Sequence, residues 1–211
     1  MHSQLNYIIA QQRAADLRAA AASSREPSAD PLVLADGRRL TIRPIEREDR
    51  ARFSDLFRRL TPDSRYRRYL TPKPRLTRTD LDHLVDIDHF RHEALAAIDE
   101  TDGSFVAAAR YVQAPEQPGV AEVAVEVVDD LHGQGIGTAL ASHTLERARA
   151  NGVTRVVATT LRENAAARAL LRRLDFRARS SGDGQIELEL ELRPNLASQC
   201  TIDQSVAQGC H

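Results

Sequence analysis

Residues 120–140 constrain the fold of this chain more than any other stretch. From Ala121 to Val128 the side chains alternate with the period of a β-strand, and valines at 123, 125 and 127 share one face. Glycines at 133, 135 and 137 then form a turn, and an apolar helical pattern runs on to Asn151-Gly152. The first amides of such a helix have no partner within it and lie at the positive end of its dipole. The stretch therefore predicts a strand, a turn and a helix whose N-terminus can bind a polyphosphate.

The spacing of the three glycines separates this turn from two common nucleotide-binding loops. The dinucleotide-binding fingerprint needs its third glycine three residues after the second, where this chain has Thr138. A Walker loop needs Lys followed by Ser or Thr after its last glycine, and no such pair follows Gly137. Two interpretations remain, namely another kind of phosphate-binding loop or a plain strand-to-helix turn that binds nothing.

The same turn resembles the cofactor loop of the GNAT superfamily of acyl-CoA-dependent N-acyltransferases. That loop reads Arg or Gln, two residues, Gly, one residue, then Gly or Ala, and residues 132–137 match it everywhere except at His132. Further on, Glu163-Asn164, a helical pattern over 165–174 and Asp175-Phe176 resemble the second cofactor-side element of the superfamily. Because the loop acts mainly through backbone amides, His132 does not remove the resemblance. The resemblance implies that this chain binds acetyl-CoA.

Shorter sequence words widen the resemblance to the acetyltransferase domain of bacterial Pat-type protein-lysine acetyltransferases, over residues 33–193. These words are Asp36-Gly37, Ile42–Ile45, Ser64–Leu70, Ala94–Ala97 and Ala121–Val125. The resemblance implies transfer of an acetyl group to an amine, with a protein lysine as the acceptor. It also implies a set of cofactor contacts: Val127, Val128, His132, Gly133, Gln134, Gly135, Ile136, Gly137, Thr138 and Asn164.

Apolar patterns predict the other elements of the fold. Strands are expected near residues 40–42, 93–98, 104–113, 121–128, 153–160 and 186–192, with a hairpin turn at 181–184. Further helices are expected at 53–60, 61–69, 80–86 and 165–174, with Thr61 and Asn164 as N-caps. The strand–helix–strand unit across 121–160 implies a parallel pair. With the resemblance, these patterns predict a mixed α/β (α+β) GNAT fold: a mostly antiparallel sheet of six to seven strands with a parallel central pair, flanked by about four helices.

The 211 residues are enough for one well-buried domain with tails. Residues 1–30 are interpreted as an N-terminal helical extension and linker, and residues 31–194 as the acetyltransferase domain. Residues 195–211 are expected to form a disordered tail, and Cys200 and Cys210 within it are given no role. No apolar run approaches about 18 residues, and no signal-peptide pattern is present. We therefore expect a cytoplasmic protein without membrane attachment, either a monomer or a homodimer.

Charge is unevenly distributed, although the net charge is only −1. Residues 38–78 carry 14 Lys or Arg against 5 Asp or Glu, whereas residues 99–130 carry one Arg against 8 acids. Because no nucleic-acid motif with interleaved aromatics accompanies the basic half, we expect no nucleic-acid partner. Acidic and histidine side chains crowd another part, but no established ligand spacing fits them and no metal is expected; they are Asp82, His83, Asp86, Asp88, His89 and His92.

Acetyl transfer to an amine needs a base, because a lysine with a pKa of about 10.4 is almost wholly protonated at neutral pH. Glu122 and Glu126 lie on the same face of the predicted central strand, near the expected position of the thioester. The Pat-type resemblance places the catalytic glutamate at Glu122. Glu126 is the alternative, since a bulge in the strand could change which of the two faces the cleft.

The resemblance extends to the other catalytic groups. It implies an oxyanion-stabilising backbone amide around Val127–Val128. It leaves the general acid unassigned, because Leu171 stands where many relatives have a tyrosine. It also places residues 61–69 over the acceptor side, which makes Arg65, Tyr66 and Tyr69 candidate substrate contacts, although the aromatics could equally pack this helix onto the sheet.

The predicted function is therefore an acetyl-CoA-dependent N-acetyltransferase that uses a glutamate base and acts on a protein lysine. Two alternatives stay open. The acceptor could be a small-molecule amine, or the chain could be a non-catalytic sensor that binds acyl-CoA through the same loop.

Overall fold

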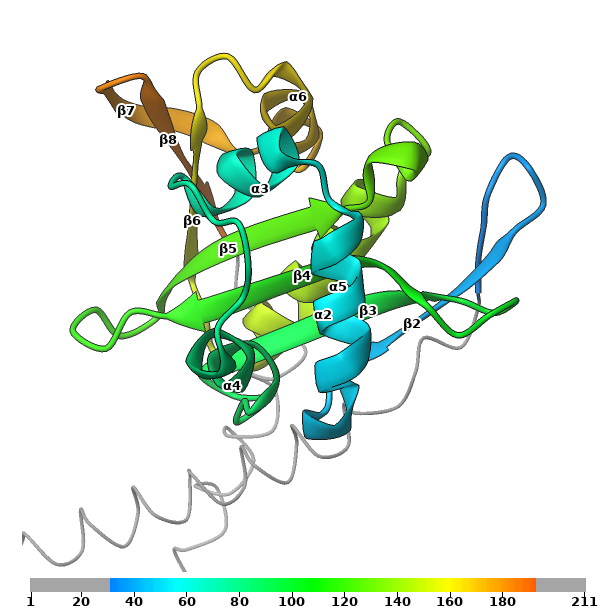
Figure 1. The fold of residues 1–211 in the computed structure, drawn as a ribbon. Helices are drawn as coiled ribbons and strands as arrows, with labels where there is room; N and C mark the ends of the chain where they lie inside the picture. Colours follow the sequence, from blue (N-terminus) through cyan, green and yellow to red (C-terminus); the bar gives the residue numbers. More distant parts are fainter. Residues whose placement is uncertain (1–30, 193–211) are drawn as a thin grey trace, which may run out of the picture.

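The computed structural model describes residues 31–192 of the chain. The predicted N-terminal extension and C-terminal tail, with both cysteines, lie outside the described residues. The described part forms one eight-stranded sheet with the strand order β1-β2-β3-β4-β5-β6-β8-β7 (Figure 1). The strands are β1 (Leu32–Val33), β2 (Arg39–Pro44), β3 (His92–Asp99), β4 (Phe105–Gln113), β5 (Val120–Val127), β6 (Arg155–Leu161), β7 (Arg177–Gly182) and β8 (Gln185–Glu191).

Five α-helices and two short 3-10 helices accompany the sheet in this part of the chain. The α-helices are α2 (Arg50–Arg59), α3 (Pro62–Tyr69), α4 (Arg78–Val85), α5 (Ile136–Ala150) and α6 (Ala165–Arg173), and the 3-10 helices are η1 (Arg47–Asp49) and η2 (Asp129–Leu131). All neighbouring strands are antiparallel except β5 and β6, which are parallel and are connected through α5. The predicted mixed fold with one parallel pair is confirmed. The sheet has one strand more than predicted because the two residues of β1, which pair with β2, are too few to leave a pattern in the sequence.

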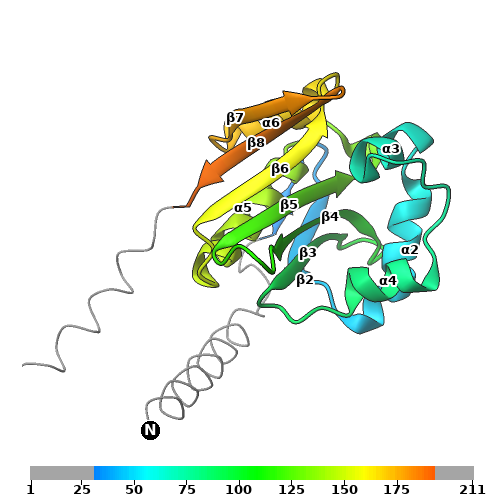
Figure 2. The same cartoon turned by 90° about the vertical axis from the view of Figure 1, so that its left-hand side faces the viewer.

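Helices cover both faces of the sheet. Because side chains alternate along a strand, β5 presents one set to each face. On one face, Val125 and Val127 lie next to Gly137 of α5, which also lies close to Leu170 of α6. On the other face, Glu126 approaches α3, and α2 and α4 complete that layer (Figures 1 and 2). The two glutamates predicted as bases therefore belong to the face that carries α2, α3 and α4.

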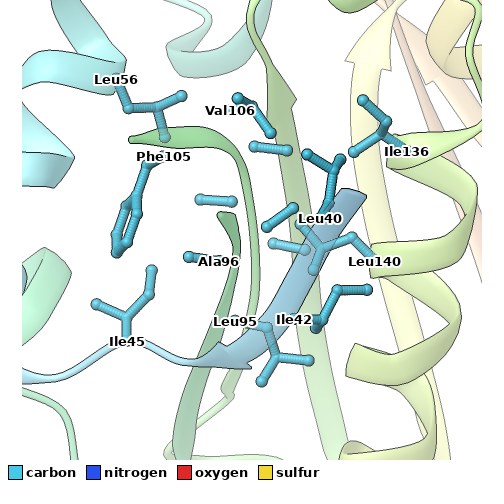
Figure 3. Close-up of a cluster of buried hydrophobic side chains, with 14 of the residues drawn as sticks. Leu40, Ile42, Ile45, Leu56, Leu95, Ala96, Phe105, Val106, Ile136 and Leu140 are labelled. Carbon is cyan, nitrogen blue, oxygen red and sulfur yellow. The ribbon is translucent and has the colours of Figure 1, made fainter. Parts of the chain in front are cut away.

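The helix α5 joins two hydrophobic clusters. Its first half packs against the strands β2–β4, where the buried side chains include Leu40, Ile42, Leu95, Ile136 and Leu140 (Figure 3). Its second half packs into a cluster with Val123, Leu145, Ala148, Val156, Phe176 and Leu188. Within α5, Ile136, Leu140, Leu145 and Ala148 are buried, as the apolar helical pattern of this stretch indicates, whereas Thr138 and Ala139 are only half-buried. Each buried Leu contributes roughly 1.5–3 kcal/mol, so this packing holds the glycine turn firmly at the middle of the sheet.

Predicted helix caps are present on two helices. The Thr61 side chain accepts a hydrogen bond from the Ser64 N–H at 3.2 Å, and Pro62 occupies the first turn of α3. The Asn164 side chain accepts a hydrogen bond from the Ala167 N–H at 3.1 Å. None of the helices between residues 31 and 192 is long and apolar enough to cross a membrane.

The basic stretch 38–78 is largely neutralised by ion pairs. Most of its basic side chains have an acidic partner: Arg38 with Asp36, Arg39 with Glu100, Arg43 and Arg52 with Asp49, Arg47 with Asp86, Arg50 with Asp82, Arg58 with Asp55, Arg59 with Asp130, Arg67 with Asp63, Arg68 with Glu126 and Lys73 with Asp80. Most of the positive charge that the sequence concentrates in this stretch is thus paired with acidic side chains nearby.

Candidate active site

The parallel strands β5 and β6 part in the middle of the sheet. Their ladder contains only the pairs Val120↔Arg155, Ala121↔Val156 and Glu122↔Val157, although both strands continue for several residues beyond it. The second half of β5 remains paired with β4 on its other side. The opening therefore lies along residues 123–127, immediately before the glycine turn.

One backbone edge of β5 faces this opening. The Val128 N–H donates to the Val106 carbonyl at 2.9 Å, on the β4 side. Hydrogen-bonded positions alternate along an antiparallel ladder, so Val125 and Val127 direct their backbone groups to the opposite side. The Val127 carbonyl accepts a hydrogen bond from His132 Nε2 at 2.9 Å, which requires the proton on Nε2. Of the two backbone amides in the predicted oxyanion region, Val127 and Val128, the Val127 N–H is therefore the one that faces the opening.

The glycine turn provides backbone N–H groups at the end of the opening. Gly133 and Gly135 have φ values of 78° and 84°, a left-handed conformation that favours glycine, and Gly135 is the N-cap of α5. The first bond of the helical ladder runs from the Ala139 N–H to the Gly135 carbonyl at 3.0 Å. The N–H groups of Ile136, Gly137 and Thr138 precede that bond, so they are available to an anion at the positive end of the helix dipole.

Gly137 serves a different purpose from the other two glycines. A Cβ atom at this position would lie 2.9 Å from Leu170 Cδ1 and 3.4 Å from Val127 Cγ2. By contrast, nothing lies within 4 Å of a Cβ built on Gly133 or Gly135. Two glycines therefore shape the turn, and the third lets α5 approach both β5 and α6.

The two predicted bases have contrasting environments. Glu122 is exposed and belongs to the last pair before the strands part. Glu126 is only 6% exposed, and its Oε2 lies 3.8 Å from Arg68 Nε on α3. Neither carboxylate oxygen of Glu126 has a hydrogen-bond partner within residues 31–192. One strand thus carries an accessible carboxylate and a buried one on the same face.

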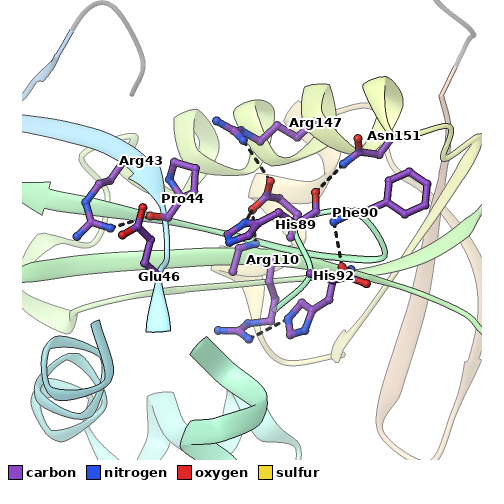
Figure 4. A network of polar contacts seen from close by, with 12 residues as sticks. Arg43, Pro44, Glu46, His89, Phe90, His92, Arg110, Arg147 and Asn151 are labelled. Atoms are coloured by element: carbon purple, nitrogen blue, oxygen red, sulfur yellow. Dashed lines mark hydrogen bonds and ion pairs between the residues drawn. The ribbon is translucent and has the colours of Figure 1, made fainter. Parts of the chain in front are cut away.

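A second arginine, Arg110 of β4, completes the buried surroundings of Glu126. One of its nitrogens, Nη1, donates to the Leu84 carbonyl at 3.3 Å and lies 3.2 Å from His92 Nε2, whereas Nη2 has no partner among the described residues (Figure 4). Burial, reinforced by Arg68, lowers the pKa of Arg110 to about 10. Burial and the neighbouring Arg110 lower the pKa of His92 to about 4, so the ring is a neutral acceptor.

The residues predicted to line the acceptor side occupy different positions around α3. Tyr66 is exposed. Tyr69 packs edge-on against Phe57 with ring centroids 5.8 Å apart, its hydroxyl is buried without a partner in the described part, and burial raises its pKa. Arg65 donates to the carbonyls of Phe57, Arg58 and Pro74 at 3.0–3.1 Å, which secures the end of α2.

The acidic and histidine side chains weighed as metal ligands are dispersed by the fold. Asp82 and Asp86 pair with Arg50 and Arg47. Asp88 accepts the backbone N–H groups of residues 90–92, and His89 pairs with Glu93. Within residues 31–192, no group of three or more His, Cys, Asp or Glu side chains is arranged to hold a metal ion.

Two further positions complete the inventory of the site. Asn164 caps α6, and Leu171 is buried in the core.

A cavity of about 600 Å³ lies elsewhere, between α2 and α4, where Arg47, Arg50, Arg78, Leu81 and Asp82 line it. We place the site at the β5–β6 opening and not at this cavity, because only the opening combines free backbone donors, a carboxylate and the glycine turn.

Sequence reasoning missed the cluster of Arg68, Arg110 and His92 around Glu126. The available signal was Arg110 itself, which interrupts an otherwise apolar strand, Phe105–Val112. An arginine in a buried strand needs a partner. The alternation of that strand alone does not say which carboxylate supplies it.

Comparison with known proteins places this geometry in a family. Residues 53–176 match the sequence model described as the Acetyltransferase (GNAT) family, and the chain belongs to that family. It is therefore a GNAT N-acetyltransferase.

Individual relatives support the same assignment. Acetyltransferase PA5475 of Pseudomonas aeruginosa is 35% identical over 145 residues, which are 68% of this chain and 77% of that protein. Acetyltransferase Pat of Mycolicibacterium smegmatis is 30% identical over 144 residues, 68% of this chain and 43% of Pat, so the chain spans less than half of that relative. The crystal structure of the GNAT domain of S. lividans PAT has a TM-score of 0.71 at 30% identity and covers 77% of this chain and 96% of that domain.

Proposed function

We propose that this acetyltransferase uses acetyl-CoA to acetylate a lysine side chain of a protein. The observation that carries the proposal is the β5–β6 opening, with its unpaired backbone edge, an accessible glutamate and a glycine turn. The protein acceptor is supported by the likeness to Pat-type GNAT domains at 30% identity.

The residues of the opening fit the chemistry of acetyl-CoA. The first-turn N–H groups of α5 would hold its diphosphate, and the open space around Gly133 and Gly135 leaves room for it. The edge of β5 at Val125 and Val127 would bind the amide-containing pantetheine arm as an added strand. The side chain of Gln134, whose Oε1 is buried without a partner in the described part, would contribute a further polar contact.

Glu122 is proposed as the base. It is exposed at the point where the strands part, so an acceptor ammonium can reach it. The Val127 N–H would stabilise the negative charge that develops on the acetyl oxygen. No dedicated acid is assigned. The departing thiolate is stable, because an ordinary thiol has a pKa near 8.5, so a dedicated proton donor is not essential.

Titration calorimetry followed by thiol release tests the proposal. Acetyl-CoA and CoA are titrated into the protein, and CoA release is then followed with lysine-containing proteins and with free amines. Binding with release that depends on proteins is the expected result. CoA release with free amines alone would show that the acceptor is a small-molecule amine and not a protein lysine. Binding of acetyl-CoA without any release would favour a non-catalytic sensor.

Loss of the base provides the matched variant. Glu122→Gln keeps the shape of the side chain, so acetyl-CoA should bind as before while transfer falls at least roughly tenfold. Glu191→Gln on β8 is the control, because it makes the same change at an exposed strand position whose partner, Arg155, lies at the closed end of the β5–β6 ladder. Transfer by Glu122→Gln at the wild-type rate would remove Glu122 from the mechanism.

A further inference from the structure

The C-terminal turn of α3 lies against Glu126. It brings Arg68, whose side chain is 15% exposed, within 3.8 Å of the Glu126 carboxylate, whose side chain is 2% exposed. The Arg68 guanidinium also lies 4.9 Å from the ring centre of Tyr69. Arg68 thus contacts both an acidic residue of β5 and the aromatic ring that follows it on α3.

Glu126 is placed between two positive charges. Arg110 from β4 is buried, and its other polar contacts are the Leu84 carbonyl and the neutral ring of His92. A buried guanidinium is costly without an opposite charge. Glu126 supplies that charge, since its attraction acts on Arg110 while Arg68 repels Arg110. It therefore links β4, β5 and α3 electrostatically.

The opposite end of α3 is secured independently. Asp129 accepts hydrogen bonds from the Thr61 N–H at 2.9 Å, the Thr61 hydroxyl at 3.0 Å and the Ser64 hydroxyl at 2.6 Å. However, α3 itself contributes no buried residue to the described core. Arg65 ties the middle of α3 to the end of α2. The position of the last turn consequently depends on the contact of Arg68 with Glu126 and on that of Tyr69 with Phe57 of α2.

Hydrogen bonding between this turn and the sheet is incomplete. Five buried polar atoms have no partner within the described residues: Arg68 Nε, Tyr69 Oη, Arg110 Nη2 and both oxygens of Glu126. Leaving such atoms unpaired costs free energy. Because they share no hydrogen bonds, the attraction between the charges of Arg68 and Glu126 holds the contact. A contact of this kind can separate and re-form at lower cost than a fully bonded one.

We infer that Glu126 is a positioning residue, which seats the C-terminal turn of α3 over the acceptor side of the active site, and that it does not act as the base. The inference rests on the proposed acetyl transfer. Loss of the seat displaces Arg68 and Tyr69 from the face that carries Glu122, so the acceptor binds less well while the chemical step is retained.

Kinetics and hydrogen exchange test the inference together. Glu126→Gln and Arg68→Gln, each alone, should raise the KM for the lysine acceptor about tenfold, the size typical of a coupled pair, and leave kcat within about threefold. The double variant should be no worse than either single one. Amide exchange over residues 62–73 should be faster in all three variants. The acid limb of the pH–rate profile should persist in each of them.

Arg67→Gln is the matched control, because Arg67 is the neighbouring arginine on α3 but pairs with Asp63 in solvent. It should change neither KM nor exchange. If Glu126→Gln does not fold, Arg68→Gln carries the same test from the partly exposed side of the pair.

Other outcomes would overturn the inference. A collapse of kcat in Glu126→Gln with loss of the acid limb and an unchanged KM would make Glu126 the base. An unchanged KM and unchanged amide exchange in Arg68→Gln would show that the Arg68–Glu126 pair does not hold the C-terminal turn of α3 in place. If the wild-type protein transfers no acetyl group, the proposed function fails, and exchange over residues 62–73 still decides whether Glu126 holds α3.

Discussion

Two buried glutamates, Glu93 on β3 and Glu126 on β5, each face an arginine from a helix, but their bonding differs. The Glu93 oxygens accept hydrogen bonds from the Ala94 N–H at 2.9 Å and Arg147 at 3.1 Å, and His89 Nδ1 lies 2.9 Å away. Glu126 has only the 3.8 Å contact with Arg68. Burial alone therefore does not distinguish the two glutamates, whereas hydrogen-bond completeness does.

The completed network around Glu93 belongs to the framework. It connects α5, through Arg147, to the segment before β3, and Asn151 extends it by donating to the His89 carbonyl and to the Tyr111 hydroxyl (Figure 4). The incomplete cluster around Glu126 lies instead beside the opening of the sheet. Fully paired polar groups rigidify a fold, and partly paired ones are found where a structure has still to change or bind.

The largest predicted effect concerns stability. Glu93→Gln should lower the free energy of unfolding by about 3–5 kcal/mol, because Arg147 loses a buried counter-charge. Glu126→Gln should cost less, about 1–3 kcal/mol: Arg110 loses an opposite charge, but the Glu126 oxygens have no hydrogen bond to lose within the described residues and Arg110 keeps the Leu84 carbonyl and the His92 ring. Urea unfolding of both variants measures the difference. Equal losses of unfolding free energy in the two variants would contradict the claim that hydrogen bonding distinguishes Glu93 from Glu126.

The pH dependence of stability follows from His92. Its pKa is lowered from 6.5 to about 4 by burial and by Arg110, so between these pH values the unfolded chain binds a proton that the folded chain does not. Stability should therefore fall as the pH drops from 6.5 towards 4, by as much as about 3 kcal/mol, and this contribution vanishes above pH 6.5. Nearby Asp88 opposes the shift.

His92→Gln isolates this contribution, because it keeps an acceptor for Arg110 but does not titrate. Unfolding measured between pH 7 and pH 4 should show a shallower loss of stability in the variant than in the wild type. Parallel curves would mean that His92 is not neutral beside Arg110.

The glycine turn should respond to backbone strain. Gly135→Ala places a side chain at a φ of 84° and costs roughly 1–2 kcal/mol in the left-handed region. We expect the turn to distort as it relieves this strain, which should lower the affinity for acetyl-CoA about tenfold. Gly182→Ala on β7 is the control, because that glycine has open space and no positive φ. Calorimetric titration of both variants decides whether the turn shape matters.

The smallest effect is expected at the exposed pair on α3. Arg67→Gln removes the i,i+4 contact with Asp63 and should change the unfolding free energy by less than about 0.5 kcal/mol. Arg68→Gln, one residue further, should cost more because its partner is buried. A larger loss for Arg67 would contradict the assignment of α3 charges to a solvent side and a sheet side.

Local patterns were sufficient for much of the fold. Alternation in β5, the caps Thr61 and Asn164, and the crossover through α5 each act over a few residues, and each appears in the structure. The two-residue strand β1 could not be predicted, because its only signal is pairing with a neighbour that lies beyond a turn.

The site was predictable only where it is continuous in sequence. The turn from His132 to Thr138 was recognised from its glycines, but the separate purposes of Gly135 and Gly137 depend on a dihedral angle and on packing against α6. The partners of Glu126 come from α3 and β4, which are distant in sequence and meet only through the sheet topology. Periodicity gives the face of each strand but not the charge opposite it.

The pH–rate profile of Glu122→Gln beside the wild type tests the central claim most directly. With a lysine-containing protein as acceptor, the variant should bind acetyl-CoA normally and transfer at least roughly tenfold more slowly at neutral pH. The deficit should shrink as the pH approaches the pKa of the free amine, about 10.4, where the acceptor deprotonates without help. Equal rates for the two proteins across the pH range would contradict the assignment of the base to Glu122.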